Sequence, residues 1–325
     1  MDTVIQILIL LASISLLIWG ATKFIDGSIV ISNAFGVPKI VIGMTIVSLG
    51  TSAPEILVSI NAALNDSTQL AVGNAIGSNI ANVGLVLGVT ACISKVPINA
   101  SLLEKEIPIL AIVSFLAGLC LYDNILGLGE STILFLTFIP ITLYLVSKYK
   151  FDTGKSVKKE LGNLSSEHSE LKSSFLWFFL GLVALLIGSE FTVKSAQSIA
   201  MMFGISELLI GATILALGTS LPELAASITS AVKKNHDIAI GNIIGSNIFN
   251  IVLVMSIAGI ISPTQLPNAV FDRDFFCMAI LTAYLIGIIV HKLKFKDTTQ
   301  GRAIGKLEGM LFLAMYLFYY VVIFF

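Results

Sequence analysis

The chain has 325 residues, of which 56% are apolar and only 12% are charged. About a quarter of the residues of a soluble domain are normally charged, so this composition excludes an ordinary soluble protein and leaves no room for a soluble catalytic domain. The net charge of −1 gives no indication of a nucleic-acid partner, and we expect none.

Long apolar stretches recur along the whole chain. A helix needs ~20 consecutive apolar residues to cross the hydrocarbon core of a bilayer. The sequence offers ten such stretches, at roughly 4–22, 40–64, 70–94, 107–122, 127–147, 175–200, 207–232, 238–261, 275–291 and 307–325. We therefore expect an all-α membrane protein with ten transmembrane helices.

The basic residues are distributed unevenly between the two sets of connections that ten spans would create. One set would hold 17 of the 19 lysines and arginines, and the other only Lys194 and Arg273. Connections rich in Lys and Arg stay in the cytoplasm. The pattern predicts a multi-pass protein of the cell (inner) membrane with both termini extracytoplasmic.

The sequence contains one long internal repeat. Residues 43–86 align with residues 211–254 without a gap, at a constant offset of 168, and 23 of the 44 positions are identical. We expect a first five-helix repeat over 1–147, a cytoplasmic linker over 148–172 and a second five-helix repeat over 173–325. An odd number of spans per repeat places the two copies in opposite orientations in the membrane, an arrangement typical of secondary transporters with a binding site at the repeat interface.

Each copy places a glutamate deep within an apolar span. A carboxylate at the centre of a membrane helix costs about 2.5–3.5 kcal/mol, so such acids indicate function. Glu55 follows Pro54 in GTSAPE, and Glu223 follows Pro222 in GTSLPE. A proline inside a helix removes a main-chain hydrogen bond and so breaks the helix. We therefore expect unpaired carbonyls near Ser48 to Thr51 and a half-helix that starts beside each acid. The alternative is a pair of structural glutamates bonded to neighbouring helices.

A second repeated motif supplies uncharged oxygen atoms. Asn74, Ser78 and Asn82 recur every four residues and so share one helix face, as do their counterparts Asn242, Ser246 and Asn250. These side chains could instead join helices by hydrogen bonds. The glycine pairs Gly73/Gly77 and Gly241/Gly245 are expected to allow close helix packing.

The polar side chains of the two motifs all offer oxygen atoms as ligands. Oxygen ligands suit hard cations such as Ca²⁺, which takes six to eight of them, and do not suit a zinc or copper site. Two carboxylates would balance the charge of one divalent cation. The residues therefore predict a site for hard cations formed by both repeats.

At these residues the chain resembles the calcium/cation antiporter superfamily, in particular its bacterial sodium/calcium exchanger branch. The resemblance spans the chain, with GTSxPE followed by GNxxGSNxxN in each repeat. It implies an antiporter that exchanges Ca²⁺ for Na⁺ by alternating access, in which the first and sixth spans slide against the rest. It implies no cofactor, no enzymatic activity, electrogenic transport and a single copy that suffices. The ligands that it implies are Glu55, Glu223, Thr51, Ser52, Thr219, Ser220, Ser78, Asn82, Ser246 and Asn250, with backbone oxygens around Ser48 and Ala216.

Some relatives, including potassium-dependent ones, carry an aspartate where Asn250 stands, which weakens the expectation of a potassium requirement here. Proton-coupled relatives usually carry a glutamate in the second motif, and this chain does not. A calcium/proton or other cation antiporter is the alternative function, and a cation channel is a more distant one.

Overall fold

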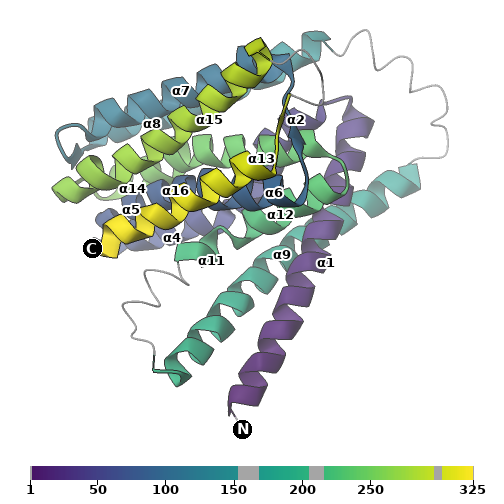
Figure 1. The fold of residues 1–325 in the computed structure, drawn as a ribbon, viewed down its shortest axis with the longest axis horizontal. Coiled ribbons are helices and arrows are strands. Elements are labelled where there is room, and N and C mark those ends of the chain that lie inside the picture. Colours follow the sequence, from purple (N-terminus) through teal and green to yellow (C-terminus); the bar gives the residue numbers. More distant parts are fainter. Residues whose placement is uncertain (1, 153–167, 205–215, 296–301, 325) are drawn as a thin grey trace.

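The computed structural model describes residues 2–152, 168–204, 216–295 and 302–324, and most of them are helical (Figure 1). Seven helices in these ranges are long and apolar enough to cross a membrane, and a bent pair, Lys39–Thr51 with Ala53–Leu64, would add an eighth. The expectation of an all-α, multi-pass membrane protein is therefore confirmed. The count of ten spans stays a prediction, because the expected span 207–232 lies partly outside the described residues.

The first half of the chain contains five helical segments, three of them continuous and two interrupted by π-helical turns (η). These are α1 (Asp2–Phe35); α2 (Lys39–Ile42), η1 (Gly43–Val47), α3 (Ser48–Thr51) and α4 (Ala53–Leu64); α5 (Thr68–Ala81), η2 (Asn82–Leu87) and α6 (Gly88–Ile93); α7 (Ala100–Leu121); and α8 (Leu128–Asp152).

The described part of the second half follows the same order. It contains α9 (His168–Met202); α11 (Ala216–Thr219) and α12 (Leu221–Val232); α13 (His236–Phe249), η6 (Asn250–Met255) and α14 (Ser256–Ile261); η7 (Val270–Phe275) and α15 (Phe276–Phe295); and α16 (Lys306–Phe324).

The repeat in the sequence is also a repeat in the backbone. The segments α4, α5, η2 and α6 have the same lengths as α12, α13, η6 and α14, and each pair is separated by the offset of 168 residues. Even the left-handed residues that follow α4 and α12 correspond, with φ of 56° at Asp66 and 60° at Lys234. The equivalent residues of the two motifs therefore occupy equivalent places on their helices.

The helices α1 and α9 run antiparallel beside each other and project away from the remaining helices at one end, while α1 also packs against α12 (Figure 1). Glycines allow the close approach: a Cβ atom at Gly27 would lie 2.6 Å from Cβ of Phe178. Both helices extend beyond the apolar stretches expected at 4–22 and 175–200. Polar residues continue α1 because they find partners, as Ser28 does by donating to the carbonyl oxygen of Phe24 at 2.8 Å.

The predicted linker is partly helical. α8 continues to Asp152 and α9 begins at His168, so both ends of the range 148–172 belong to helices, and residues 153–167 lie outside the described part. Charged residues favour helix as readily as loop when they lie at the end of a long helix, so charge alone did not locate these ends.

The central segment of the second half, α13, is buried along almost its whole length. Gly241 and Gly245 allow it to pack on α2 and η1, because a Cβ atom at Gly245 would lie 2.5 Å from the carbonyl oxygen of Met44. Cβ atoms at their counterparts Gly73 and Gly77 would have no described residue within 4 Å. The expectation of close packing is thus right for the second glycine pair. For the first pair it stays a prediction, because the residues of the second half that correspond to α2 and η1 lie in 207–215, outside the described part.

Two short antiparallel strand pairs join connections that are distant in sequence. β1 (Val96–Pro97) pairs with β4 (Ala303–Ile304), and β2 (Ile125–Leu126) pairs with β3 (Thr264–Gln265). Each pair therefore fixes one connection of the first half beside one of the second.

Candidate cation-binding site

The helices break where the sequence places Pro54 and Pro222. α3 ends at Thr51 and α4 begins at Ala53, with Ser52 between them at φ −83° and ψ 7°. Ser220 has nearly the same conformation, φ −87° and ψ 4°, before α12. Proline fits the first turn of a helix because the N–H it lacks would have no intrahelical partner there. Both glutamates thus lie in the first turn of a half-helix, where the helix dipole favours negative charge.

The carboxylate of Glu223 is completely buried and accepts hydrogen bonds from both halves of the chain. Its Oε1 accepts from the hydroxyl of Ser52 at 2.9 Å and from that of Ser246 at 3.5 Å. Ser52 occupies the N-cap position of α4 but makes no side-chain cap bond, because its hydroxyl donates across the repeat interface to Glu223 instead.

Glu55 has the equivalent place in the first repeat and is also buried. Its Oε1 accepts from the hydroxyl of Ser78 at 3.4 Å. Among the described residues, Oε2 of Glu55 and Oε2 of Glu223 have no hydrogen-bond partner. A buried carboxylate oxygen without a donor is costly, so each acid keeps one oxygen free for a ligand.

The amides of the second motif support the breaks in both repeats. Nδ2 of Asn74 lies 3.5 Å from the main-chain oxygen of Glu55, and Nδ2 of Asn242 lies 3.4 Å from that of Glu223. Oδ1 of Asn242 accepts from the hydroxyl of Thr51 at 3.1 Å. Asn74 and Asn242 thus act as helix-to-helix links, one of the two readings left open by the sequence.

Several of the predicted ligands are buried polar groups without a partner in the described part of the chain. They are the hydroxyls of Thr219 and Ser220, both amide atoms of Asn82, and Oδ1 of Asn250. Asn82 and Asn250 are also the first residues of η2 and η6. Single π-helical turns are frequent at functional sites, and no feature of the sequence predicts these two.

One expectation about the backbone is wrong. The carbonyl oxygen of Ser48 is not freed by the break, because it accepts from the N–H of Ser52 at 2.9 Å and from the hydroxyl of Thr51 at 3.3 Å. The proline lies two residues beyond Ser52, too late to remove that bond. Ala216 begins α11, and the residues just before it lie outside the described part.

Asn79 and Asn247 were missed as individual residues, although both lie in the repeated GNxxGSNxxN motif. Nδ2 of Asn79 donates to the main-chain oxygen of Asn247 at 3.1 Å, and these two residues are equivalent in the repeat. Their position one residue after each serine placed them off the expected polar face, but a repeated buried asparagine was a usable signal.

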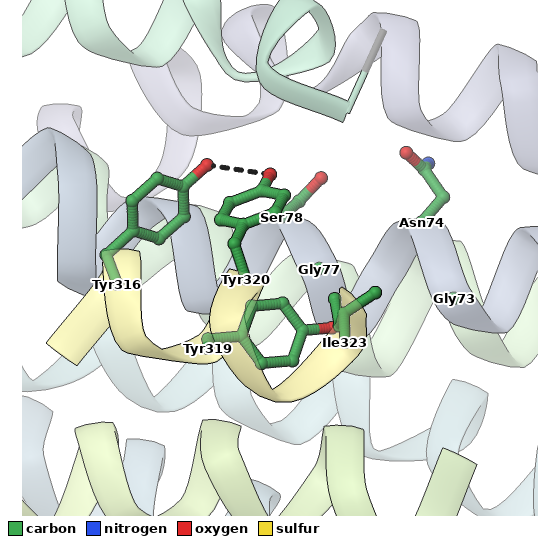
Figure 2. A pocket seen from close by; sticks show the side chains of 8 residues that line it. All are labelled: Gly73, Asn74, Gly77, Ser78, Tyr316, Tyr319, Tyr320 and Ile323. Carbon is green, nitrogen blue, oxygen red and sulfur yellow. Dashed lines mark hydrogen bonds between the residues drawn. The ribbon is translucent and has the colours of Figure 1, made fainter. Parts of the chain in front are cut away.

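A cavity of about 120 Å³ adjoins the site on the side of Ser78. Figure 2 shows Asn74 and Ser78 projecting from α5 towards it, with Tyr316 and Tyr320 of α16 on the other side. The open space over Gly73 and Gly77 belongs to this cavity. A water molecule takes up ≈ 30 Å³ in the liquid. The cavity therefore has room for several waters beside Ser78, whose hydroxyl donates to Glu55.

Together these groups form a buried, oxygen-rich candidate site to which both halves contribute, with one carboxylate from each and several neutral oxygens that have no partner in the described structure. Such a donor set suits hard cations. A fixed charge of up to −2 is matched by one divalent or two monovalent cations.

Comparison with known proteins agrees with the family resemblance found in the sequence. The sequence profile described as "Sodium/calcium exchanger protein" matches residues 5–147 and 173–325. The chain is 38% identical to the putative antiporter CaxA of Alkalimonas amylolytica, over 97% of both chains. It is 36% identical to the inner membrane protein YrbG of Escherichia coli, over 92% of both. The structure matches that of the sodium-calcium exchanger NCX_Mj with a TM-score of 0.82 at 30% identity, covering 98% of this chain and 99% of the other. The chain therefore belongs to the sodium/calcium exchanger family.

Proposed function

We propose that the protein is a secondary active antiporter that exchanges Ca²⁺ for Na⁺ across the cell inner membrane by alternating access. One observation carries the proposal: Glu55 and Glu223, one from each half, are buried at equivalent helix breaks, and each has a carboxylate oxygen without a hydrogen-bond partner among the described residues. Family membership and the likeness to an exchanger that was soaked with Na⁺ support the choice of ions.

The two glutamates neutralise one Ca²⁺ or two Na⁺, and the uncharged groups complete the coordination. The proposed ligands from the first repeat are Thr51, Ser52, Glu55, Ser78 and Asn82, and those from the second are Thr219, Ser220, Glu223, Ser246 and Asn250, with main-chain oxygens around Ala216. No cofactor is required, because the transported ions themselves occupy the site.

The proposed topology has two inverted five-helix repeats, a cytoplasmic linker over 148–172 and both termini outside. Four contacts between distant parts of the chain support this topology, since each joins two connections that the ten-span arrangement assigns to the same side of the membrane. They are the β1–β4 pair, the β2–β3 pair, Lys39 Nζ to Asn235 Oδ1 at 2.9 Å and Gln69 Nε2 to the carbonyl oxygen of Gln265 at 3.0 Å. The family profile also leaves out the linker range.

The moving part in this proposal is the α1–α9 pair, whose two helices pack mainly on each other and also contact the site through α3, α11 and α12. Sliding of this pair would expose the site to one side and then to the other without rebuilding it. Every proposed ligand comes from one chain, so a single copy suffices.

The coupling ion can be tested in proteoliposomes that contain the purified protein. Uptake of ⁴⁵Ca²⁺ should be driven by an outward Na⁺ gradient and not by a proton gradient of the same size in Na⁺-free buffer. Uptake driven by protons alone would replace this proposal with a calcium/proton antiporter. A Ca²⁺ current that needs no counter-ion would indicate a channel.

A further inference from the structure

Asn79 links the two halves of the site, although it is outside the proposed ligand set. It lies on α5 directly after Ser78 and is buried. Its Nδ2 donates to the main-chain carbonyl oxygen of Asn247 at 3.1 Å, and its Oδ1 accepts from Nδ2 of Asn250 at 3.0 Å. Its Nδ2 also lies 3.4 Å from Sδ of Met278. One side chain therefore contacts three residues of the other repeat, and one of these, Asn250, is a proposed ligand.

The direction of this hydrogen-bond chain follows from its fixed end. A main-chain carbonyl oxygen can only accept, so Asn79 must turn its NH₂ group towards Asn247. Its oxygen then faces Asn250, and Asn250 must turn its own NH₂ group towards Asn79. The oxygen Oδ1 of Asn250 is left on the other side of that amide, buried and without a partner among the described residues.

The equivalent bond in the other half of the site is not made. The offset of 168 relates Asn79 to Asn247 and Asn82 to Asn250, so the counterpart would join Asn247 and Asn82. Both side-chain atoms of Asn82 and both of Asn247 lack a hydrogen-bond partner in the described structure. The protein thus fixes the amide orientation of Asn250 but not that of Asn82.

We propose that Asn79 is a positioning residue for cation binding, which holds the amide of Asn250 with its oxygen towards the ions. This inference rests on the proposed function of the site. An unrestrained amide can turn either its oxygen or its NH₂ group towards a cation, and the NH₂ group repels it. A side chain that is already oriented loses less freedom when the ligand binds.

The same geometry explains how a neutral residue can serve at position 250. An aspartate there would present an oxygen on both sides and would need no orientation. It would also place a carboxylate oxygen against Oδ1 of Asn79, so two acceptors would face each other. The oxygen of Asn79 therefore requires an NH₂ group at position 250, and an asparagine at position 250 in turn needs Asn79 to orient its amide.

The test is a double-mutant cycle on the full-length purified protein, with Ca²⁺ binding measured by titration calorimetry. Asn79→Leu removes the side-chain hydrogen bonds of Asn79, including the one that orients Asn250, at similar volume and should raise the Kd for Ca²⁺ about tenfold, the effect expected from one lost hydrogen bond. In an Asn250→Ala background there is no amide to orient, so Asn79→Leu should change the Kd no further. In flux assays the half-saturating Ca²⁺ concentration should rise while the maximal rate stays near that of the unmodified protein.

Asn247→Leu is the matched control, because it alters the equivalent buried asparagine, whose side chain makes no hydrogen bond in the described structure. It should raise the Kd less than Asn79→Leu does. An unchanged Kd in Asn79→Leu, equal losses in the two variants, or the same loss in the Asn250→Ala background would each overturn the inference. If Asn79→Leu does not fold, Asn79→Ala enters the same cycle. Failure of the unmodified protein to bind Ca²⁺ would instead overturn the proposed function.

Discussion

The hydroxyl of Ser52, in the first repeat, donates a hydrogen bond of 2.9 Å to Oε1 of Glu223, in the second. The same hydroxyl lies 3.1 Å from that of Ser246. Residues that are 171 positions apart in sequence thus share one buried contact at the repeat interface, and neither repeat could form the site alone.

We expect Ser52→Ala to weaken Ca²⁺ binding about ten- to a hundredfold, because a hydrogen bond to a charged group contributes about 1.5–3 kcal/mol and Glu223 would lose its shortest one. Ser52→Thr keeps a hydroxyl and serves as the control. Titration calorimetry on both variants checks this, and equal affinities would show that the bond does not hold Glu223 in place.

Glu55→Gln and Glu223→Gln should each abolish Ca²⁺ transport while the protein still folds. A low-dielectric site that loses one of its two anions cannot balance a divalent cation. ⁴⁵Ca²⁺ uptake with size-exclusion profiles measures both properties.

Glu190→Gln is the control for these variants, because Glu190 is also a glutamate on a long apolar helix. Its side chain is 60% exposed and pairs with Lys194 at 2.6 Å within α9, so its loss should leave uptake near normal. Near-normal uptake from a folded Glu55→Gln or Glu223→Gln protein would mean that the acids are structural.

Gly245 should not tolerate alanine without a loss of stability. A Cβ atom at Gly245 would lie 2.5 Å from the carbonyl oxygen of Met44 and 2.6 Å from Oγ of Ser48. Overpacking costs about 1–3 kcal/mol, so Gly245→Ala should lower the thermal midpoint in detergent. A midpoint equal to that of the unmodified protein would contradict the packing described for α13.

Much of this account could be predicted from the sequence because the repeat carries most of the information. Two copies of GTSxPE located the breaks at Ser52 and Ser220, and the buried acids followed from them. The helix that packs against Gly241 and Gly245 could not be predicted, since a pair of glycines indicates close packing without indicating the partner. The π-helical turns at Asn82 and Asn250 were also missed, because one extra residue in a turn leaves no clear signal in the hydropathy pattern.

Transport should be electrogenic. One Ca²⁺ or two Na⁺ neutralise two ionised glutamates, and the resemblance to sodium/calcium exchangers favours a third Na⁺, held by hydroxyl and carbonyl dipoles. Na⁺-driven Ca²⁺ flux in proteoliposomes should therefore change with an imposed membrane potential. Flux that is indifferent to a clamped potential would indicate a two-for-one exchange.

Asn250→Asp adds an anion beside the pair and sets a carboxylate against Oδ1 of Asn79. We expect a larger change in ion selectivity or in the pH dependence of flux than in the thermal midpoint. A variant that loses stability without a change in selectivity would show that Asn250 is a packing residue.

The termini should both lie outside the cytoplasm, with 148–172 inside. A cysteine placed at the C-terminus should react with an impermeant reagent added to spheroplasts, and one placed within 148–172 should react only after lysis. The opposite labelling would invert the topology.

The central claim is that Ca²⁺ and Na⁺ use the same buried site, and calorimetric titration of Ca²⁺ into the purified protein at increasing Na⁺ concentrations tests it most directly. The account predicts a Kd for Ca²⁺ that rises with Na⁺, and no Ca²⁺ binding in Glu223→Gln at any Na⁺ concentration. A Kd that does not depend on Na⁺, or unchanged Ca²⁺ binding by the folded Glu223→Gln protein, would contradict it.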